Sequence, residues 1–277
     1  MDIVYFGTDV FLSCFEYLSA HHHIRALYTY HNDEDYFTEY EIVRQAKEMG
    51  IPVHYEAVTP EKTRAYFENG VSLYFSAEYD RIIDIPKDLP AFKGLNIHSS
   101  ALPKGRGYYP IESAMDRGEL RTGVTIHKLK QRFDSGEILG QRTFDIAPDM
   151  DSIDIYLTSA ANALAMTKEI FSDFDYAWNH AAAQEKKETY WQRPDTSKMT
   201  LHHDMNVKTA LETVRRYNGM TEAVICQETY YVRSAVKGRA LLPKPEIRIS
   251  DDLFLYALKD GHVRLVVKQN GQKRGTV

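Results

Sequence analysis

The segment DIVYFGTDVFLSCFEYLSAHHHIRALYTY, residues 2–30, carries the pattern that decides the fold. Residues 2–6 form a short apolar run typical of a buried strand, and residues 9–18 have apolar side chains at helical spacing. Residues 24–30 then return to a strand pattern. A strand, a helix and a second strand in this order predict two parallel strands joined by a right-handed crossover.

The same alternation continues along the chain, with a helix over 39–49, a strand over 51–55, a helix over 61–68 and a strand over 71–75. This order predicts the α/β class, with a Rossmann-like, mostly parallel sheet flanked by helices. After Pro110 we expect a helix over 111–117, strands over 123–129 and 138–146, and a long helix through about residue 174. Asp151 or Ser152 is suited to cap that long helix.

The last third of the chain has a different pattern. Residues 184–198 are polar and resemble a linker, a helix is expected over 208–217, and short strands are expected over 223–226, 230–235, 254–257 and 263–267. We therefore predict a catalytic domain over 1–183, a linker over 184–200 and a small, mostly β subdomain over 201–277.

Composition narrows the class of protein. The 277 residues are 43% hydrophobic and 26% charged, as in ordinary globular proteins, and no apolar run is long enough for a membrane span. Cys14 and Cys226 are the only cysteines, which excludes a disulfide framework and a cysteine-based metal site and indicates the cytoplasm. The net charge of −5 argues against a general nucleic-acid binder. Residues 200–277 nevertheless carry 13 Lys and Arg against 8 Asp and Glu, which a mixed solvated surface also explains.

Three short motifs do not indicate bound groups. FGTD, residues 6–9, has one glycine where a phosphate-binding loop needs several. The runs at residues 21–23 (HHH) and 202–204 (HHD) have no converging cysteine or carboxylate cluster, so we expect solvated turns there and no metal site.

A candidate site lies in LNIHSSALPKGRGYYP, residues 95–110. Asn96 and His98 are two apart on an expected strand, so they point to the same side, at the end where α/β proteins bind ligands. Asp134 follows another expected strand in RFDSGE. A carboxylate can orient and charge an imidazole, and an asparagine amide can donate to an oxyanion. By themselves, three polar residues are as compatible with a structural role.

These motifs resemble a known family. NIHSSALPKGRGYYPIESAM (96–115) and GVTIHKLKQRFDSGEIL (123–139) are similar to the signature of the 10-formyltetrahydrofolate-dependent formyltransferases, which include glycinamide ribonucleotide, methionyl-tRNA and amino-sugar enzymes. DIVYFGT (2–8) and AKEMGIPVH (46–54) extend the resemblance. It implies that Asn96, His98 and Asp134 are the catalytic trio. Formyl would pass from N10 of the folate to a primary amine, with Asn96 and protonated His98 stabilising the oxyanion and Asp134 orienting His98.

The resemblance also implies binding residues. The folate co-substrate is expected between the loops FSAEYDRIID (75–84) and LKQRFDSGE (129–137), with Ser76, Ala77, Tyr79, Arg132 and Ser135 lining its pocket. On the acceptor side we expect Ser100, Lys104, Arg106, Tyr108 and Tyr109. The two tyrosines stand where relatives often have small or other polar residues, and Ala101 stands where many have leucine. Arg106 fits equally well as a structural residue of the loop.

The acceptor stays open at this point. The nearer likeness is to nucleotide-linked amino-sugar N-formyltransferases, for which Lys104 and Arg106 could meet a diphosphate and the tyrosines could stack on a base or sugar. Methionyl-tRNA formylation is the main alternative. The tRNA enzymes resemble one another in a longer basic insertion, whereas residues 30–40 (YHNDEDYFTEY) are short and acidic and disfavour nucleic acid. A small amino-acid-type amine, a catalytically silent binding protein and a homodimer are also compatible with the sequence.

Overall fold

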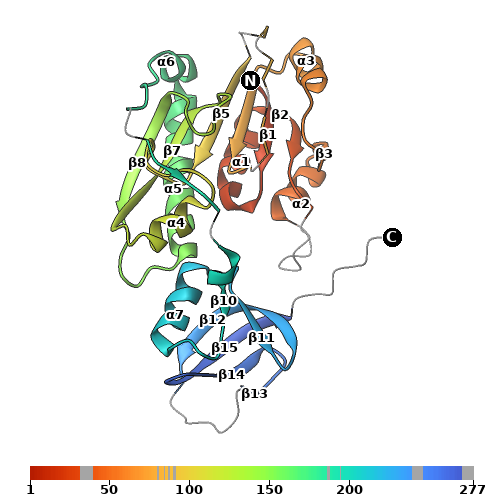
Figure 1. Cartoon of the computed structure of the whole chain (residues 1–277). Helices are drawn as coiled ribbons and strands as arrows, with labels where there is room; N and C mark the ends of the chain where they lie inside the picture. The colour runs from red at the N-terminus through yellow and green to blue at the C-terminus, as the bar shows by residue number, and fades with distance from the viewer. Residues whose placement is uncertain are drawn as a thin grey trace.

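The computed structural model of the chain describes residues 1–31, 40–79, 81–83, 85–86, 88–89, 92–185, 188–193, 195–238 and 246–269. Within these residues the chain forms a seven-stranded sheet, a six-stranded sheet and a two-stranded ladder. The two large sheets lie in separate parts of the molecule (Figure 1).

The seven-stranded sheet has the order β3-β2-β1-β4-β5-β7-β8. Its strands are β1 (Asp2–Gly7), β2 (His23–Tyr28), β3 (Val53–His54), β4 (Leu73–Ala77), β5 (Lys93–His98), β7 (Arg121–Lys128) and β8 (Ile138–Asp145). The first five in this order pair in parallel, whereas β7 is antiparallel to β5 and β8 is antiparallel to β7. The expected Rossmann-like, mostly parallel sheet is confirmed.

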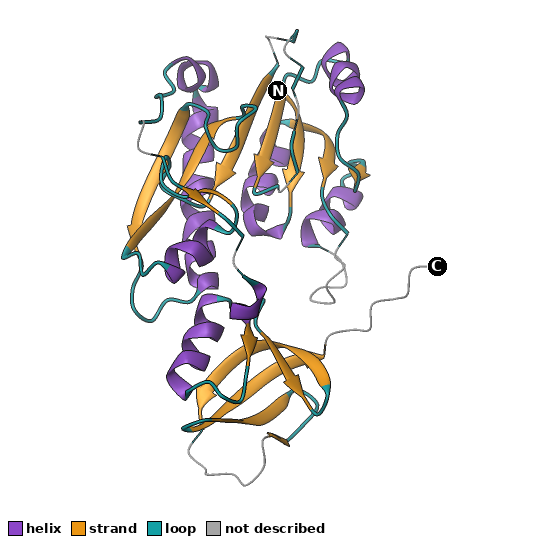
Figure 2. Ribbon diagram, in the orientation of Figure 1, coloured by secondary structure: helices purple, strands orange, loops and turns teal. Residues whose placement is uncertain are grey.

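Helices cover both faces of this sheet (Figure 2). They are α1 (Leu12–His21), α2 (Glu41–Glu48), α3 (Pro60–Glu68), α4 (Pro110–Asp116), α5 (Ser152–Ser172) and α6 (Phe174–Asn179), with a 3₁₀ turn η1 (Asp9–Phe11) before α1. Adjacent residues of a strand point to opposite faces. Phe75 therefore packs in the cluster that includes α1 and α5, whereas the Tyr74 hydroxyl donates to Thr63 of α3 at 3.0 Å.

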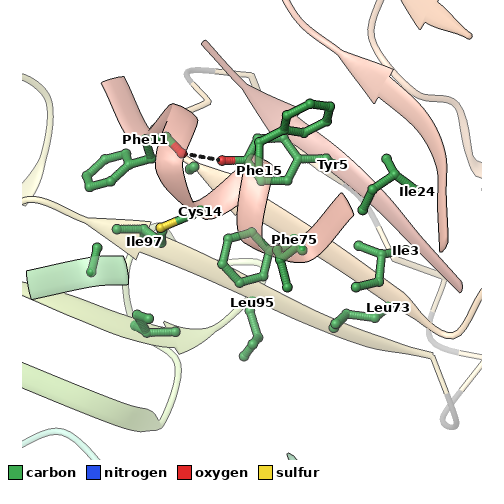
Figure 3. Close-up of a cluster of buried hydrophobic side chains, with 14 of the residues drawn as sticks. Ile3, Tyr5, Phe11, Cys14, Phe15, Ile24, Leu73, Phe75, Leu95 and Ile97 are labelled. Carbon is green, nitrogen blue, oxygen red and sulfur yellow. Dashed lines mark hydrogen bonds between the residues drawn. The ribbon is translucent and has the colours of Figure 1, made fainter. Parts of the chain in front are cut away.

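The main core lies between the sheet and helices α1 and α5. Figure 3 shows Phe15 and Cys14 of α1 over Phe75 and Ile97 of the sheet. Tyr5 is buried in the same cluster, and its hydroxyl donates to the carbonyl of Phe11 at 3.2 Å, so the polar end of this large side chain is satisfied.

The six-stranded sheet has the order β10-β11-β12-β15-β14-β13 and is covered by α7 (Val207–Arg216). Its strands are β10 (Thr200–Leu201), β11 (Glu222–Ile225), β12 (Glu228–Lys237), β13 (Glu246–Arg248), β14 (Leu253–Leu258) and β15 (Gly261–Gln269). This β-rich region agrees with the expected class. β10 and β13 were not expected, because two or three residues are too few to show an alternating pattern.

Polar contacts tie the end of α7 to the first part of the chain. The Tyr217 hydroxyl donates to Asp116 at 2.7 Å, Arg216 pairs with Asp116 at 2.9 Å, and Asn218 Nδ2 donates to Asp151 at 2.6 Å. These contacts connect the second sheet to the ends of α4 and α5.

The segment between the two large sheets differs from a simple linker. β9 (Tyr190–Trp191) pairs in parallel with β6 (Arg106–Gly107), and a 3₁₀ turn η2 (Thr196–Met199) follows. The Trp191 ring packs so closely on Gly105 that a Cβ there would lie 2.6 Å from it. Part of the expected linker 184–200 is thus packed against the loop that follows β5. Among the described residues, no helix is long and apolar enough to cross a membrane.

Removing the capping side chains of α3 and α5 should separate the stability contributed by a helix cap from the stability contributed by a contact between distant segments. Asp151 caps α5 by accepting from the N–H of Asp154 and also accepts from Asn218, whereas Thr59 caps α3 by accepting from the N–H of Lys62. We expect Thr59→Ala to lower the free energy of unfolding by about 1 kcal/mol and Asp151→Ala by about 2 kcal/mol, measured by urea unfolding. Equal losses in the two variants would show that the Asn218 contact contributes nothing.

Candidate active site

The end of β5 places Asn96 and His98 on one face of the sheet. Asn96 lies between Ser76 of β4 and His127 of β7, to which it is paired in register, and His98 lies opposite Thr125. Both side chains are buried, with 9% of Asn96 and 5% of His98 exposed. Strand pairing on both sides therefore fixes their backbone, as a catalytic geometry requires.

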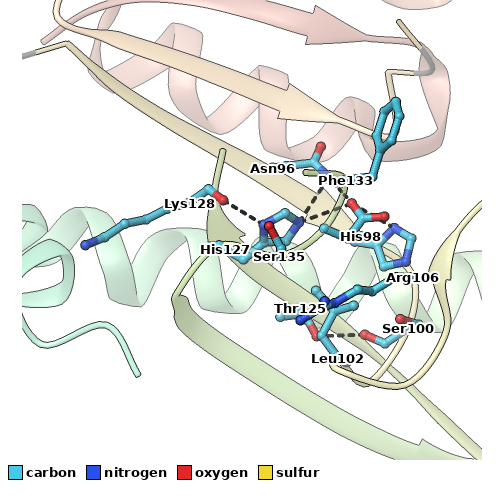
Figure 4. A network of polar contacts seen from close by, with 12 residues as sticks. Asn96, His98, Ser100, Leu102, Arg106, Thr125, His127, Lys128, Phe133 and Ser135 are labelled. Carbon is cyan, nitrogen blue, oxygen red and sulfur yellow. Dashed lines mark hydrogen bonds and ion pairs between the residues drawn. The ribbon is translucent and has the colours of Figure 1, made fainter. Parts of the chain in front are cut away.

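Asp134 joins these side chains from the loop between β7 and β8. Figure 4 shows Asn96, His98 and His127 of the same cluster. Its Oδ2 accepts the N–H of Gly107 at 2.9 Å. Its Oδ1 lies 3.8 Å from His98 Nδ1, 3.5 Å from His127 Nε2 and 3.5 Å from Asn96 Nδ2. The structure thus brings together the three residues that the sequence analysis singled out.

The environment of Asp134 keeps its carboxyl charged. Burial by itself would raise the pKa, but the charges of His98 and His127 and the N–H of Gly107 outweigh burial and hold the pKa well below its usual range. Asp134 therefore carries a negative charge within this cluster.

The hydrogen bonds of the two histidines indicate where their protons lie. His98 Nε2 is 2.7 Å from the carbonyl of Gly105, and His127 Nδ1 is 2.9 Å from the carbonyl of Lys128. Because a carbonyl only accepts, each of these nitrogens carries a proton. The second nitrogen of His98, Nδ1, faces Asp134 Oδ1 at 3.8 Å. The second nitrogen of His127 lies 3.3 Å from Asn96 Nδ2.

His127 was not among the predicted site residues. It belongs to GVTIH, residues 123–127, in which every second residue points to the same face as it does. The signal that could have revealed it is the register of β7 on β5, and that register is not visible in the sequence. We assign His127 the task of orienting Asn96 and Asp134.

A pocket of about 190 Å³, which we call the central pocket, opens at this cluster. It is lined by Glu78, Tyr79, Asn96, His98, Gly107, Tyr108, Tyr109, Pro110, Phe133, Asp134, Tyr156 and Arg193. Tyr79, expected on the folate side, and the acceptor residues Tyr108 and Tyr109 all reach it. The guanidinium of Arg193 lies over the Tyr108 ring at 4.9 Å.

A second cavity of about 530 Å³, the apolar hollow, lies farther along the same sheet face. It is lined by Ile82, Ile83, Ile85, Pro86, Leu89, Phe92, Gly94, Lys128, Leu129, Lys130, Gln131 and Trp178. These residues include parts of the two loops that the sequence analysis named for folate, but they are different residues from those nominated.

The nominated folate residues other than Tyr79 lie elsewhere. Ser76 and Ala77 are buried within β4. The exposed Arg132 pairs with Glu188, and Ser135 Oγ donates to the carbonyl of Arg132 at 2.7 Å. None of these four lines the central pocket or the apolar hollow.

Three nominated acceptor residues also stay away from the central pocket. Arg106 is 3% exposed, and its guanidinium bonds to Gln184 and Glu188. It is therefore a structural residue of the loop rather than a contact for a diphosphate. Lys104 pairs with Glu119 on the surface, and the buried Ser100 donates to the carbonyl of Lys104 at 2.8 Å.

A third cavity, the outer hollow, adjoins the central pocket and shares Arg193 with it. It measures about 500 Å³ and is lined by Ser113, Asp116, Arg117, Tyr190, Gln192, Arg193, Asp195 and Lys198. Its lining is mainly polar and includes three cationic side chains.

Comparisons with known proteins agree with this geometry. Residues 38–165 match the family model described as formyl transferase. A methionyl-tRNA formyltransferase of Leptospira interrogans serogroup Icterohaemorrhagiae serovar copenhageni (strain Fiocruz L1-130) is 35% identical over 115 residues, which are 39% of this chain and 36% of that protein. The match therefore spans about a third of the length of this curated relative.

Two solved structures share the fold at low sequence identity. HypX from Aquifex aeolicus in complex with tetrahydrofolic acid has a TM-score of 0.70 at 16% identity, over 95% of this chain and 43% of that chain. An N-formyltransferase from Helicobacter canadensis, in complex with folinic acid and dTDP-3-aminofucose, has a TM-score of 0.62 at 18% identity, over 96% and 98%. With the three side chains together and the family model matched over residues 38–165, this part of the chain is assigned to the formyl transferase family.

Proposed function

We propose that this protein transfers a formyl group from 10-formyltetrahydrofolate to the primary amine of a nucleotide-linked amino sugar. One observation carries the proposal: the apolar hollow and the central pocket lie along the same sheet face, with Asn96 between them. Gly94, Asn96 and His98 are alternate residues of β5 and so share a face. Gly94 lines the apolar hollow, and Asn96 and His98 line the central pocket.

This arrangement suits a transfer between two substrates. An apolar cavity walled by isoleucines and Trp178 fits the flat ring system of a folate. Lys128 and Lys130 lie on its wall, where cationic groups can attract the carboxylates of the folate tail. The acceptor would then enter the central pocket, so that donor and acceptor meet at Asn96 and Asp134.

The trio can carry out the chemistry of the transfer. The amine attacks the formyl carbon, and the carbonyl oxygen becomes an oxyanion. Asn96 Nδ2 lies 3.3 Å from His127 Nε2 and 3.5 Å from Asp134 Oδ1. Because the contact with Asp134 is the longer one, the N–H that points to Asp134 can turn toward the oxyanion. A protonated His98 adds positive charge and relays a proton to N10 as the C–N10 bond breaks.

The outer hollow favours a nucleotide-linked acceptor. A sugar in the central pocket that extends past Arg193 reaches a polar surface with Arg117 and Lys198. Tyr108, 37% exposed beneath Arg193, offers a ring on which a base or sugar can stack. The solved N-formyltransferase of Helicobacter canadensis holds such a ligand, dTDP-3-aminofucose.

Methionyl-tRNA is the second candidate acceptor. It is supported by the names of the sequence relatives and by the excess of Lys and Arg in residues 200–277. The acidic stretch 30–40, which argued against tRNA, lies mostly outside the described residues. The preference for a nucleotide-linked amino sugar over methionyl-tRNA therefore depends on the outer hollow.

Substituting the trio tests the proposed reaction. We expect Asn96→Ala and His98→Ala each to lower kcat by about 10²-fold or more, because each removes stabilisation of the oxyanion. The assay follows formyl transfer from 10-formyltetrahydrofolate to dTDP-3-aminofucose and related nucleotide amino sugars, with methionyl-tRNA in parallel.

Ser135→Ala is the matched control for these variants, because it removes a polar group from the same loop but outside both cavities. Its kcat should stay within twofold of the wild type. Formylation of methionyl-tRNA but of no nucleotide sugar would overturn the proposed acceptor, and unchanged activity in both alanine variants would overturn the assigned site.

Filling the apolar hollow should weaken folate binding. A Cβ on Gly94 would lie 2.6 Å from Ile85 Cδ1 and 2.9 Å from Leu129 Cδ1, so a larger side chain must displace both into the cavity. We expect Gly94→Val to raise the Kd for folinic acid at least tenfold, measured by titration calorimetry. If the variant stays folded by circular dichroism and binds as tightly as the wild type, the folate site lies elsewhere.

A further inference from the structure

Two carboxyls, the half-buried Glu78 and the buried Glu112, lie beside the central pocket and have no part in the chemistry above. Glu78 follows β4 and lines the pocket, and its Oε1 accepts the N–H of Ser99, the residue after His98, at 3.0 Å. Its φ of 51° is in the left-handed region, which is unfavourable for glutamate. Strain held at a pocket wall is typical of functional residues.

Glu112 lies behind this wall, in the first turn of α4. It is 0% exposed, and neither of its oxygens has a hydrogen-bond partner of normal length among the described residues. The Tyr156 hydroxyl of α5 is close enough to favour its charged form, and Tyr156 itself lines the pocket. A buried carboxyl with so few hydrogen-bond donors lowers the stability of the fold, and its presence therefore indicates a function.

We propose that Glu78 is the base of the central pocket: it holds the acceptor as an ammonium ion and takes one proton from it before the amine attacks. Glu112 is a positioning residue for this base: it contacts Tyr156, which lines the same pocket, and its charge and that of Glu78 repel each other. The inference rests on the proposed formyl transfer, because it assigns the first proton of that reaction.

The protons balance with this assignment. An N–H bond of the ammonium breaks, the proton passes to the Glu78 carboxylate, and the freed electron pair forms the bond to the formyl carbon. The C–N10 bond then breaks with its electron pair on N10. A second N–H proton of the former amine reaches N10 through His98, and Glu78 releases its own proton to solvent.

The charged groups around the two carboxyls support the assignment. Burial raises the pKa of Glu78, while His98 opposes and Asp134 adds to that rise. Burial likewise raises the pKa of Glu112 to about 7, with Glu78 and Asp116 adding to the rise. Tyr109, Tyr156 and Tyr217 also interact with these carboxyls, and Arg193 lines the same pocket as Glu78. A carboxylate with a raised pKa accepts a proton more readily near neutral pH.

The test replaces Glu78 by glutamine, whose side-chain carbonyl can still accept the Ser99 N–H but cannot take a proton. The probes are dTDP-3-aminofucose and ethylamine, both protonated at pH 7, and hydroxylamine, which is mainly neutral there. With 10-formyltetrahydrofolate as donor, we expect Glu78→Gln to lose about 10²-fold in kcat/KM toward the protonated amines and to keep activity toward hydroxylamine. The loss should shrink as the pH rises, because neutral amine becomes available.

Glu119→Gln is the matched control, since Glu119 pairs with the surface Lys104 and lines neither the central pocket nor the apolar hollow. An equal loss toward all three nucleophiles in Glu78→Gln would overturn the inference, because it would indicate a structural role. A wild type that formylates hydroxylamine but no protonated amine would also overturn it. A wild type inactive with every nucleophile would instead overturn the proposed function, and unchanged folinic acid binding would show that Glu78→Gln is folded.

Glu112→Gln tests the positioning role through pH profiles. Removing the nearby carboxyl should move the acidic limb of kcat/KM to lower pH, and an unchanged limb would overturn this role.

The pH dependence of stability gives a second readout for Glu112→Gln. Because the pKa of Glu112 is higher in the folded protein, about 7 against an ordinary 4.5, the folded state binds the extra proton and loses stability as the pH rises through this window. Glu112→Gln should remove that loss in urea unfolding at pH 5 and pH 8, and an undiminished loss would again overturn the role.

Discussion

The charge of Asp134 is the constraint around which the site is arranged. A carboxylate largely removed from water is costly unless donors surround it. Here the donors come from three other segments: Gly107 from the loop after β5, His98 and Asn96 from β5, and His127 from β7. The positions of these segments are therefore linked, because a shift in any one of them leaves a buried charge less compensated.

The segment after the seven-stranded sheet holds this arrangement in place. Gln184 Nε2 donates to the carbonyls of Asp134 and Gly136 at 2.7 and 2.8 Å, while its Oε1 accepts from Arg106. Glu188 completes the pairing of the buried Arg106. A single amide thus connects the Asp134 loop to the Gly107 loop, and both are fixed by residues that resemble a linker in the sequence.

The sequence was sufficient to predict the features that follow from the local pattern of residues. It was not sufficient to predict contacts that depend on how distant strands and helices are aligned and packed. The alternation of apolar runs located nearly every strand and helix of the first sheet, and the two-residue spacing of Asn96 and His98 predicted their common face. Arg106 was ambiguous, since nothing near it in sequence shows that Gln184 and Glu188 lie beside it. Glu112 and Tyr156 were missed for the same reason: each looks like an ordinary helix residue until α4 and α5 are packed together.

The two loops that the resemblance implies for folate, residues 75–84 and 129–137, also show what the sequence does not reveal. Residues of both loops line the apolar hollow, but side-chain direction within a loop follows no simple period. Ile82 and Gln131 reach the apolar hollow, whereas Arg132, next to Gln131, turns outward to Glu188. The sequence of a loop therefore does not show which of its side chains line a cavity.

The three acids near the central pocket show how position gives one chemical group different states. Asp134 accepts an N–H and faces two imidazoles, so its pKa is lowered and it stays charged. Glu112 has burial without a full set of donors, so its pKa rises to about 7. Glu78 lies between these extremes, with one N–H donor, a nearby imidazole and a raised pKa. Groups whose environments separate their proton affinities in this way can divide acid and base steps among themselves at neutral pH. A transfer that removes protons from an amine can use such a separation within a single pocket.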